Sequence, residues 1–166
     1  MMKKKIALYG VFIALTLMVS FIESLIPLPI AIPGIKLGLA NSVILFVLFS
    51  IGEKDAFFVS ILRVIIAGFL FANMAAILYS LSGAIFSFLV MYLLKKTDKF
   101  SIIGVSISGS IAHNLGQLFV AVIVTSVQTV MFYVPYLLIA GVITGILIGI
   151  LGKEVIGRIP KYLILK

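Results

Sequence analysis

The chain has no cysteine, a single histidine and few acidic residues. Without cysteine it forms neither disulfides nor thiolate metal sites, and one histidine cannot build a metal site alone. No two aspartates lie close enough to form the paired cluster that holds magnesium on a diphosphate, and no glycine-rich phosphate loop with its lysine is present. We therefore predict no metal site, no catalytic residues and no bound cofactor. A protein of this kind is not an enzyme, and any ATP would be bound by a partner. The acidic residues are Glu23, Glu53, Asp55, Asp98 and Glu154.

Charge of either sign is also scarce. Charged residues make up 11% of the 166 positions and hydrophobic residues 63%, whereas about a quarter of a typical soluble domain is charged. With a mean hydropathy of +1.36, this composition excludes a water-soluble fold. A helix that spans the bilayer takes about 20 residues. The length therefore predicts one all-α transmembrane domain of six helices over residues 1–166, with no second domain.

The apolar runs place these helices near residues 6–26, 38–52, 56–72, 74–94, 101–125 and 129–151. Of the 13 lysines and arginines, all fall on one side of the membrane except Lys36, on the other side, and Arg63, within a span. Positive charge collects on the cytoplasmic side of membrane proteins, so both termini are predicted to be cytoplasmic. The same rule explains the net charge of +8 without a nucleic-acid partner. We expect a multi-pass protein of a bacterial cell membrane, in contact with lipid.

Small residues recur every four positions in three of the expected helices, which lets helix backbones approach closely in a membrane. We expect these ridges to pack within the monomer rather than between copies. For the shorter pair Gly10 and Ala14, near the cytoplasmic end of the first helix, contact within the monomer and contact between copies both stay open. The three ridges are Gly104, Ser108, Ala112 and Gly116; Gly141, Gly145 and Gly149; and Ala76, Ser80 and Ala84.

Polar side chains inside a membrane are costly, so each needs a reason to be there. Here they lie between the membrane centre and the outer surface, which predicts a pocket that opens outward. Two alternatives stay open: Arg63 forms an internal ion pair with Glu23, or His113 and Asn114 hydrogen-bond neighbouring backbone. The candidate substrate-binding residues are Glu23, Lys36, Asn41, Arg63, Asn73, His113, Asn114 and Gln117.

The stretch from Pro27 to Asn41 reads PLPIAIPGIKLGLAN, and its prolines preclude helix through most of it. Bare backbone is not tolerated against lipid, so this apolar segment either folds over the outer face or dips into the bundle. A loop that merely caps the bundle is the alternative. Lys36 and Arg63 together favour an anionic ligand group. Near the other end of the chain, Pro135 is expected to interrupt the last helix.

Three segments carry a resemblance to a known family: PGIKLGLAN (33–41), SLSGAIFSFLVM (80–91) and SGSIAHNLGQL (108–118). They resemble the Gx transporter family, also labelled heptaprenyl diphosphate synthase component I. The family is thought similar in fold to the S components of energy-coupling-factor transporters. S components have six helices, capture a vitamin-like compound from outside, and dock on a membrane scaffold subunit driven by cytoplasmic ATPases. The resemblance implies that Gly10 and Ala14 stand where an Ala-x-x-x-Ala pair meets that scaffold.

The residues and the resemblance together predict the substrate-binding membrane component of a small-molecule uptake system. Its ligand would be vitamin- or precursor-like and anionic, and partner subunits would supply the energy. The alternative is a non-catalytic membrane accessory subunit in prenyl diphosphate or quinone metabolism. A structural anchor for a neighbouring complex, without any cavity, is a third alternative.

Overall fold

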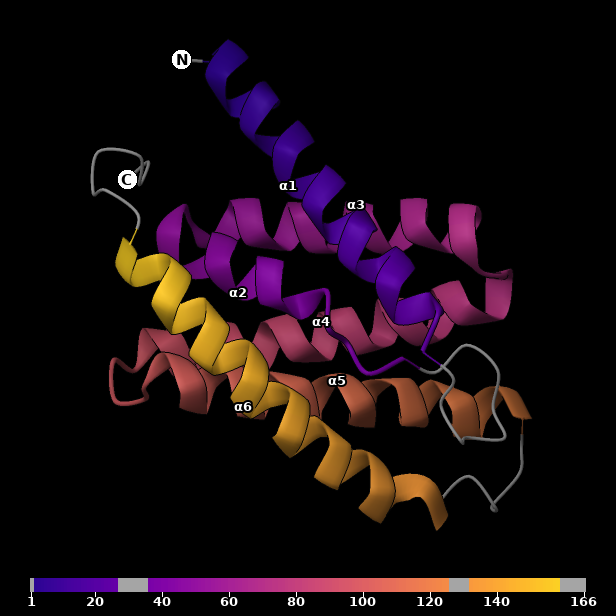
Figure 1. The fold of residues 1–166 in the computed structure, drawn as a ribbon. Helices are drawn as coiled ribbons and strands as arrows, with labels where there is room; N and C mark the ends of the chain where they lie inside the picture. The colour runs from indigo at the N-terminus through magenta and orange to yellow at the C-terminus, as the bar shows by residue number, and fades with distance from the viewer. Residues whose placement is uncertain (1, 27–35, 126–131, 159–166) are drawn as a thin grey trace.

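The computed structural model describes residues 2–26, 36–125 and 132–158, and within these ranges it is helical with no β-strand. The expected all-α fold is confirmed (Figure 1). All three prolines of the segment 27–41 lie outside the described residues. The helices are α1 (Met2–Ser24), α2 (Asn41–Ser50), α3 (Glu53–Phe71), α4 (Met74–Lys96), α5 (Ile102–Thr125) and α6 (Val134–Arg158).

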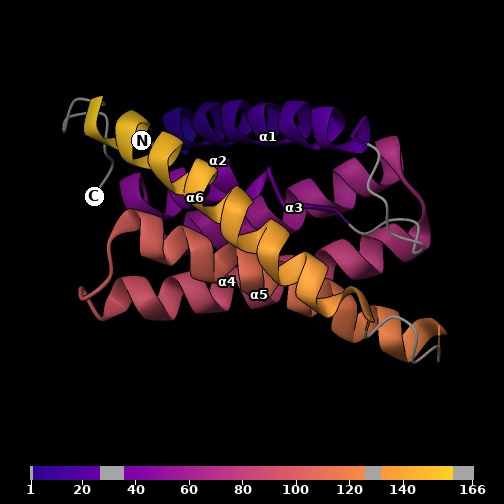
Figure 2. The same ribbon diagram turned by 60° about the horizontal axis from the view of Figure 1, so that its bottom comes forward.

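The helices form a layered bundle. Figure 2 shows α1 on one face and α4 with α5 on the opposite face, with α2 and α3 between them. α4 packs along α5, and α6 crosses α5 obliquely while also contacting α2. The start of α1, the α2–α3 junction, the α4–α5 connection and the end of α6 lie at one end of the bundle in both views. We call this the inner end, because the positive-inside rule assigns it to the cytoplasm.

Among the described residues, four helices are long and apolar enough to cross a membrane: α1, α4, α5 and α6. α3 carries Glu53, Lys54 and Asp55 in its first turn and Arg63 near its middle. α2 has only 10 residues, about 15 Å, or half of the hydrocarbon core. The helix expected over 38–52 is shorter because residues 36–40 are not helical. α2 therefore begins at mid-depth rather than at the outer surface.

The last helix also differs from the prediction. α6 begins at Val134, with Pro135 in its first turn, and continues to Arg158 instead of ending near 151. Proline suits the first turn of a helix, because its missing N–H has no intrahelical partner there. The prediction that Pro135 interrupts this helix was wrong. The expected start near 129 lies outside the described residues.

The small-residue ridges pack inside the monomer, as expected. A Cβ added at Gly145 would lie 2.5 Å from the Cα of Ile107, and one at Gly149 would lie 2.7 Å from the Cα of Ile103. On the other side of α5, a Cβ at Gly116 would lie 3.0 Å from the carbonyl oxygen of Ser82 on α4. Backbone-to-backbone contact on both sides thus fixes α5 between α4 and α6.

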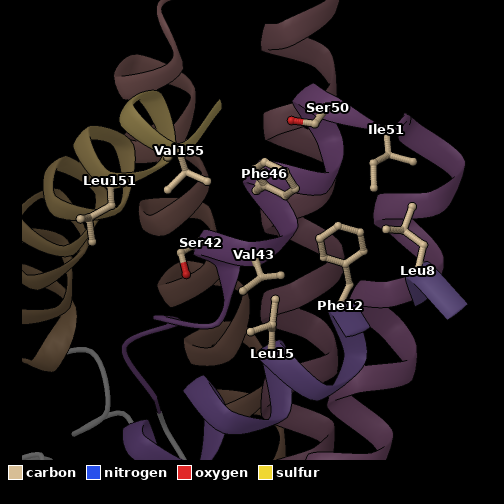
Figure 3. A pocket seen from close by; sticks show the side chains of 11 residues that line it. Leu8, Phe12, Leu15, Ser42, Val43, Phe46, Ser50, Ile51, Leu151 and Val155 are labelled. Carbon is tan, nitrogen blue, oxygen red and sulfur yellow. The ribbon is translucent and has the colours of Figure 1, made fainter. Parts of the chain in front are cut away.

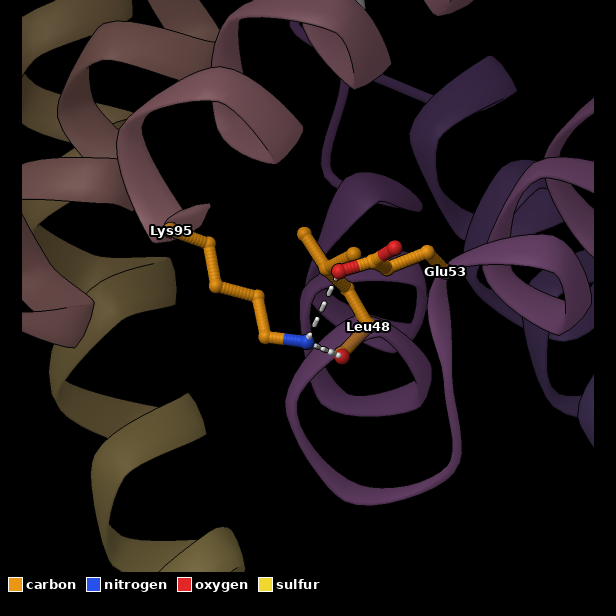
Figure 4. A network of polar contacts seen from close by, with 3 residues as sticks. All are labelled: Leu48, Glu53 and Lys95. Atoms are coloured by element: carbon orange, nitrogen blue, oxygen red, sulfur yellow. Dashed lines mark hydrogen bonds and ion pairs between the residues drawn. The ribbon is translucent and has the colours of Figure 1, made fainter. Parts of the chain in front are cut away.

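α2 is surrounded by other helices: Ile44, Leu45, Val47 and Leu48 are all fully buried. Its C-terminal carbonyls have no partner within the helix, and Lys95 of α4 supplies one. The Lys95 Nζ donates to the carbonyl oxygen of Leu48 at 2.7 Å and lies 3.9 Å from the carboxylate of Glu53 (Figure 4). This lysine therefore ties α4 to the end of α2.

Candidate ligand-binding site

Buried polar side chains from five helices meet where α2 begins. Each of them is no more than 4% exposed. We call this set the polar cluster. It brings together most of the candidate residues that the sequence singled out and adds Ser87, which the sequence analysis missed. Its members are Glu23 of α1, Asn41 of α2, Arg63 of α3, Ser87 of α4, and His113, Asn114 and Gln117 of α5.

The non-helical residues 36–40 dock onto this cluster through their backbone. The side-chain amide of Gln117 accepts a hydrogen bond from the Lys36 N–H at 2.8 Å and donates one to the Lys36 carbonyl at 2.9 Å. A single side chain therefore satisfies both backbone groups of a residue that belongs to no helix. Such pairing is what irregular backbone needs at membrane depth. Residues 36–40 therefore lie within the bundle, whereas the rest of the segment predicted either to dip into it or to fold over the outer face, 27–35, lies outside the described residues.

Glu23 serves the same segment. Its Oε1 accepts hydrogen bonds from the backbone N–H groups of Gly38 and, at 3.2 Å, Leu39. Glu23 does not form the ion pair with Arg63 that the sequence left open. Ion pairs within 4.0 Å in the described part of the chain join only Lys95 with Glu53 and Arg158 with Glu154. The buried carboxylate thus acts as an acceptor that holds backbone in place.

Arg63 is linked to α2 and α4 by a chain of hydrogen bonds. Its Nη2 donates to the Oδ1 of Asn41 at 2.8 Å, and the Asn41 Nδ2 donates to the Oγ of Ser87 at 3.4 Å. The Arg63 Nε is buried and has no partner among the described residues. A guanidinium with an unused donor, next to the start of a helix, is suited to bind an anion.

His113 is held between two glycines. A Cβ added at Gly38 would lie 2.8 Å from the ring Cδ2, and one added at Gly83 would lie 2.9 Å from the ring Nδ1. Gly38 also has a φ of +81°, which side chains disfavour. Both positions therefore require glycine, and together they fix the plane of the imidazole. The ring lies against Gly83, whose backbone offers it a hydrogen-bond partner.

Asn114 faces α6 rather than α4. Its Nδ2 donates to the backbone carbonyl of Leu137 at 2.8 Å, so the backbone alternative considered from the sequence holds for this amide donor. The Asn114 Oδ1 is buried without a partner in the described part of the chain. The amide nitrogen of Asn114 therefore links α5 to α6, and its amide oxygen is left unpaired.

The charge balance of the site is positive. Lys36 and Arg63 both interact electrostatically with Glu23, the one carboxylate near them. The other acidic residues lie toward the inner end: Asp55 accepts from Tyr9, Glu53 lies near Lys95, Glu154 pairs with Arg158, and Asp98 follows α4. Two cations and one carboxylate leave the site with an excess positive charge.

Three other candidate residues lie apart from the polar cluster. Asn73 is exposed and caps α4, where its Oδ1 accepts from the Ala76 N–H at 2.9 Å. Gly10 and Ala14 are exposed on α1, and a Cβ added at Gly10 would meet no atom within 4 Å. Both residues thus lie on an exposed face of α1.

Sequence reasoning missed the glycines that hold His113, although both stand in the motifs that carry the family resemblance. Gly38 lies in PGIKLGLAN and Gly83 in SLSGAIFSFLVM. The recurrence of glycine beside polar residues in these segments was the available indication. Only the fold shows that the two glycines face one imidazole.

The comparisons with known proteins agree with this picture. The family model described as heptaprenyl diphosphate synthase component I matches residues 12–155, a range that includes every member of the polar cluster. No curated protein and no solved structure matches the chain. Since the match spans most of the sequence, the chain belongs to the heptaprenyl diphosphate synthase component I family.

Proposed function

We propose that this protein is the substrate-binding membrane component of a small-molecule uptake system, and that the polar cluster binds an anionic compound. The observation that carries the proposal is the buried guanidinium of Arg63, whose Nε has no partner among the described residues; the Oδ1 of Asn114 is likewise buried and unpaired there. A buried donor or acceptor left unpaired costs about 1–3 kcal/mol, and more for a charged group. The cost is greatest for the charged guanidinium of Arg63, and an anionic ligand that pairs with its Nε would remove that cost.

The chemistry of the unpaired atoms suggests the chemistry of the ligand. Arg63 and Lys36 would hold a carboxylate or phosphate, helped by the positive end of the α2 dipole. His113 and Asn114 would hydrogen-bond a polar edge that offers at least one donor to the Asn114 Oδ1. Glu23, Asn41 and Gln117 would act indirectly, because they hold residues 36–40 and Arg63 in position.

The location of the polar cluster supports capture from outside. Glu23 stands at the end of α1 opposite the N-terminus, and Gln117 lies in the second half of α5, which rises from the inner end. With the N-terminus in the cytoplasm, the cluster lies between the membrane centre and the outer face. A ligand would enter from the outer side, in the cell membrane of a bacterium.

Partner subunits would supply the energy. The open space around Gly10 on the exposed face of α1 leaves room for a helix of a membrane scaffold subunit, with Ala14 one turn further along. Cytoplasmic ATPases bound to that scaffold would carry the ATP. The protein itself would not be an enzyme: its family is named as one component of a synthase, and the polar cluster has one carboxylate, not the pair that diphosphate chemistry with magnesium needs.

The decisive experiment is ligand binding by an Arg63→Ala variant. Native mass spectrometry of the wild type, purified gently from its own membranes, should show a small anionic molecule bound to the chain. Arg63→Ala should lose this molecule while it still inserts and elutes as a folded species. Arg158→Ala, which removes an exposed arginine from α6, is the matched control and should keep it. Full retention of the ligand by Arg63→Ala would remove the residue from the site.

The second candidate function is a non-catalytic accessory subunit in prenyl diphosphate or quinone metabolism, and the name of the family favours it. That role requires a long prenyl chain to reach the site from the lipid beside His113. The His113 side chain is only 2% exposed and lies between two glycines. The closed surroundings of this residue support a small compact ligand over a long chain.

A further inference from the structure

A cavity lies at the inner end of the bundle and shares no residue with the polar cluster. Its volume is about 540 Å³, within the range of about 300–1,000 Å³ that is usual for small-molecule pockets. Figure 3 shows its side chains converging from α1, α2 and α6. The lining is almost entirely apolar: Leu8, Phe12, Leu15, Ser42, Val43, Phe46, Ser50, Ile51, Leu151, Gly152 and Val155. We call it the inner groove.

The inner groove faces the lipid. α1 and α6 form its two sides, yet no Cα atoms of these helices come within 8 Å of each other in the described part of the chain. Both helices instead contact α2, which forms the floor. Since α1 and α6 are each long and apolar enough to cross the membrane, the space between them opens sideways into hydrocarbon. Water does not fill an apolar space of this kind readily, but a hydrocarbon chain does.

Ser50 gives the inner groove one unused polar group. Its hydroxyl is buried, with the residue 3% exposed, and has no partner among the described residues. A hydroxyl within a helix usually bonds a carbonyl of the preceding turn, as Thr144 does with Ala140 at 2.8 Å. Ser50 lines the groove at the end of α2 nearest the cytoplasm (Figure 3). The hydroxyl can therefore donate to an acceptor of a bound molecule at the level of the inner interface.

Basic residues stand at the same end of the inner groove. Lys153 directly follows the lining residue Gly152, and Lys54 comes three residues after Ile51. Both lysines are exposed. Glu53 and Asp55 flank Lys54, and Glu154 follows Lys153, so the positive excess belongs to the inner end as a whole, where eleven lysines and arginines are expected against four acidic residues. Lysines just outside the hydrocarbon attract the anionic lipids of the cytoplasmic leaflet. The inner groove thus matches the three parts of an anionic phospholipid in order. Its apolar lining suits an acyl chain, the Ser50 hydroxyl suits the ester group, and the positive charge at the inner end suits the headgroup.

We propose that the inner groove binds one acyl chain of an anionic phospholipid from the cytoplasmic leaflet. The chain lies on α2 between α1 and α6, and an ester carbonyl of the lipid accepts the hydrogen bond of Ser50. The headgroup lies near Lys153 and Lys54. The bound lipid fills the space between two helices whose Cα atoms stay more than 8 Å apart in the described part of the chain, so it stabilises the position of α1. This site is independent of the polar cluster and of the ligand proposed there.

The test uses the full chain reconstituted in vesicles of equal parts phosphatidylglycerol and phosphatidylcholine, extracted gently and examined by native mass spectrometry. The wild type should retain one phosphatidylglycerol per chain. Val43→Trp, which fills the groove, should bind it about tenfold more weakly, because the indole displaces at least two methylene groups of the acyl chain. Val142→Trp on α6, outside the groove lining, is the matched control and should retain the lipid.

A second, milder variant keeps the test valid if Val43→Trp fails to fold. Ser50→Ala keeps the packing and removes only the hydroxyl, so it should weaken lipid retention by about two- to tenfold. Equal retention by the wild type, Val43→Trp and Ser50→Ala would overturn the proposal. Retention of phosphatidylcholine as readily as phosphatidylglycerol would also overturn it, as would an isoprenoid lipid or a copurifying polypeptide found in the groove instead. Arg63→Ala should leave lipid retention unchanged, so failure here and failure of the proposed function are distinguishable.

Discussion

The side-chain amide of Gln117 pairs with both backbone groups of Lys36, at 2.8 and 2.9 Å. This pairing replaces the partner that a neighbouring turn of helix would have offered. Because residues 36–40 are not helical and lie within the bundle, their backbone groups must find side chains or pay a large desolvation cost. A residue 81 positions away in sequence thus determines whether this segment stays docked.

Replacing Gln117 by leucine should undock the segment. Gln117→Leu leaves the N–H and the carbonyl of Lys36 unpaired, at a cost of about 1–3 kcal/mol for each group. The melting temperature in detergent should fall clearly, and binding at the polar cluster should weaken with it. Leu115→Ala, at a lipid-facing position on the same helix, should change the melting temperature little. Equal melting temperatures for the two variants would contradict this role of Gln117.

Gly38→Ala should destabilise the protein by two separable effects. The φ of +81° costs an alanine about 1–3 kcal/mol, and the new Cβ would also lie 2.8 Å from the His113 ring. In the double variant Gly38→Ala with His113→Ala, the clash with the ring is removed but the backbone strain stays. A double-mutant cycle should therefore show coupling between the two positions. Gly10→Ala, with open space around it, should be neutral or slightly stabilising. Strict additivity of the two substitutions would contradict the contact.

Lys95→Met should loosen the end of α2. The substitution leaves the Leu48 carbonyl without the donor at 2.7 Å, so the free energy of unfolding should fall by about 1–3 kcal/mol. Lys96→Met, one residue further, is the control and should have little effect. Glu53→Gln separates the two interactions of Lys95: at 3.9 Å with a half-exposed carboxylate, the ion pair should contribute under about 1 kcal/mol. A larger loss from Glu53→Gln than from Lys95→Met would reverse this ranking.

Gly145→Val should separate α6 from α5. A Cβ at this position would lie 2.5 Å from the Cα of Ile107, and backbone cannot move aside as a flexible side chain does. We expect severe loss of folded protein in detergent, measured by size-exclusion chromatography and thermal unfolding. Gly157→Val on the same helix meets no atom within 4 Å and should remain folded. Normal stability of Gly145→Val would mean that the two helices do not pack through this ridge.

Hydropathy predicted the helices, and the spacing of small residues predicted packing within the monomer, because both depend on local composition; which helices pair was not predicted. They did not predict the length of α2. The residues before Asn41 are as apolar as those after it, and only the φ of Gly38 and the bonds from Glu23 and Gln117 stop the helix there. Because polar groups are costly to bury in a membrane, we predicted that Arg63, Asn41 and His113 would lie together inside the bundle, and they do.

The partners of those polar residues could not be predicted in the same way. The sequence suggested Arg63 as the partner of Glu23, since opposite charges attract, but the carboxylate accepts backbone N–H groups instead. Every residue except proline has a backbone N–H, so a sequence does not show which N–H groups a buried carboxylate will accept. The inner groove was missed for a related reason: an apolar hollow between apolar helices has the same composition as a packed core. Binding of a ligand by the polar cluster stays a prediction.

The orientation of the chain in the membrane can be tested directly, because the natural sequence has no cysteine and any introduced thiol is unique. Lys99→Cys lies in the α4–α5 connection at the inner end, and Met74→Cys lies at the start of α4, where the residue is 65% exposed. A membrane-impermeant maleimide added to intact cells should label Met74→Cys and spare Lys99→Cys, and permeabilised cells should show both labelled. The opposite pattern would place the polar cluster toward the cytoplasm. In that case the excess positive charge around Arg63 would face the cell interior, and uptake from outside could not begin at this site.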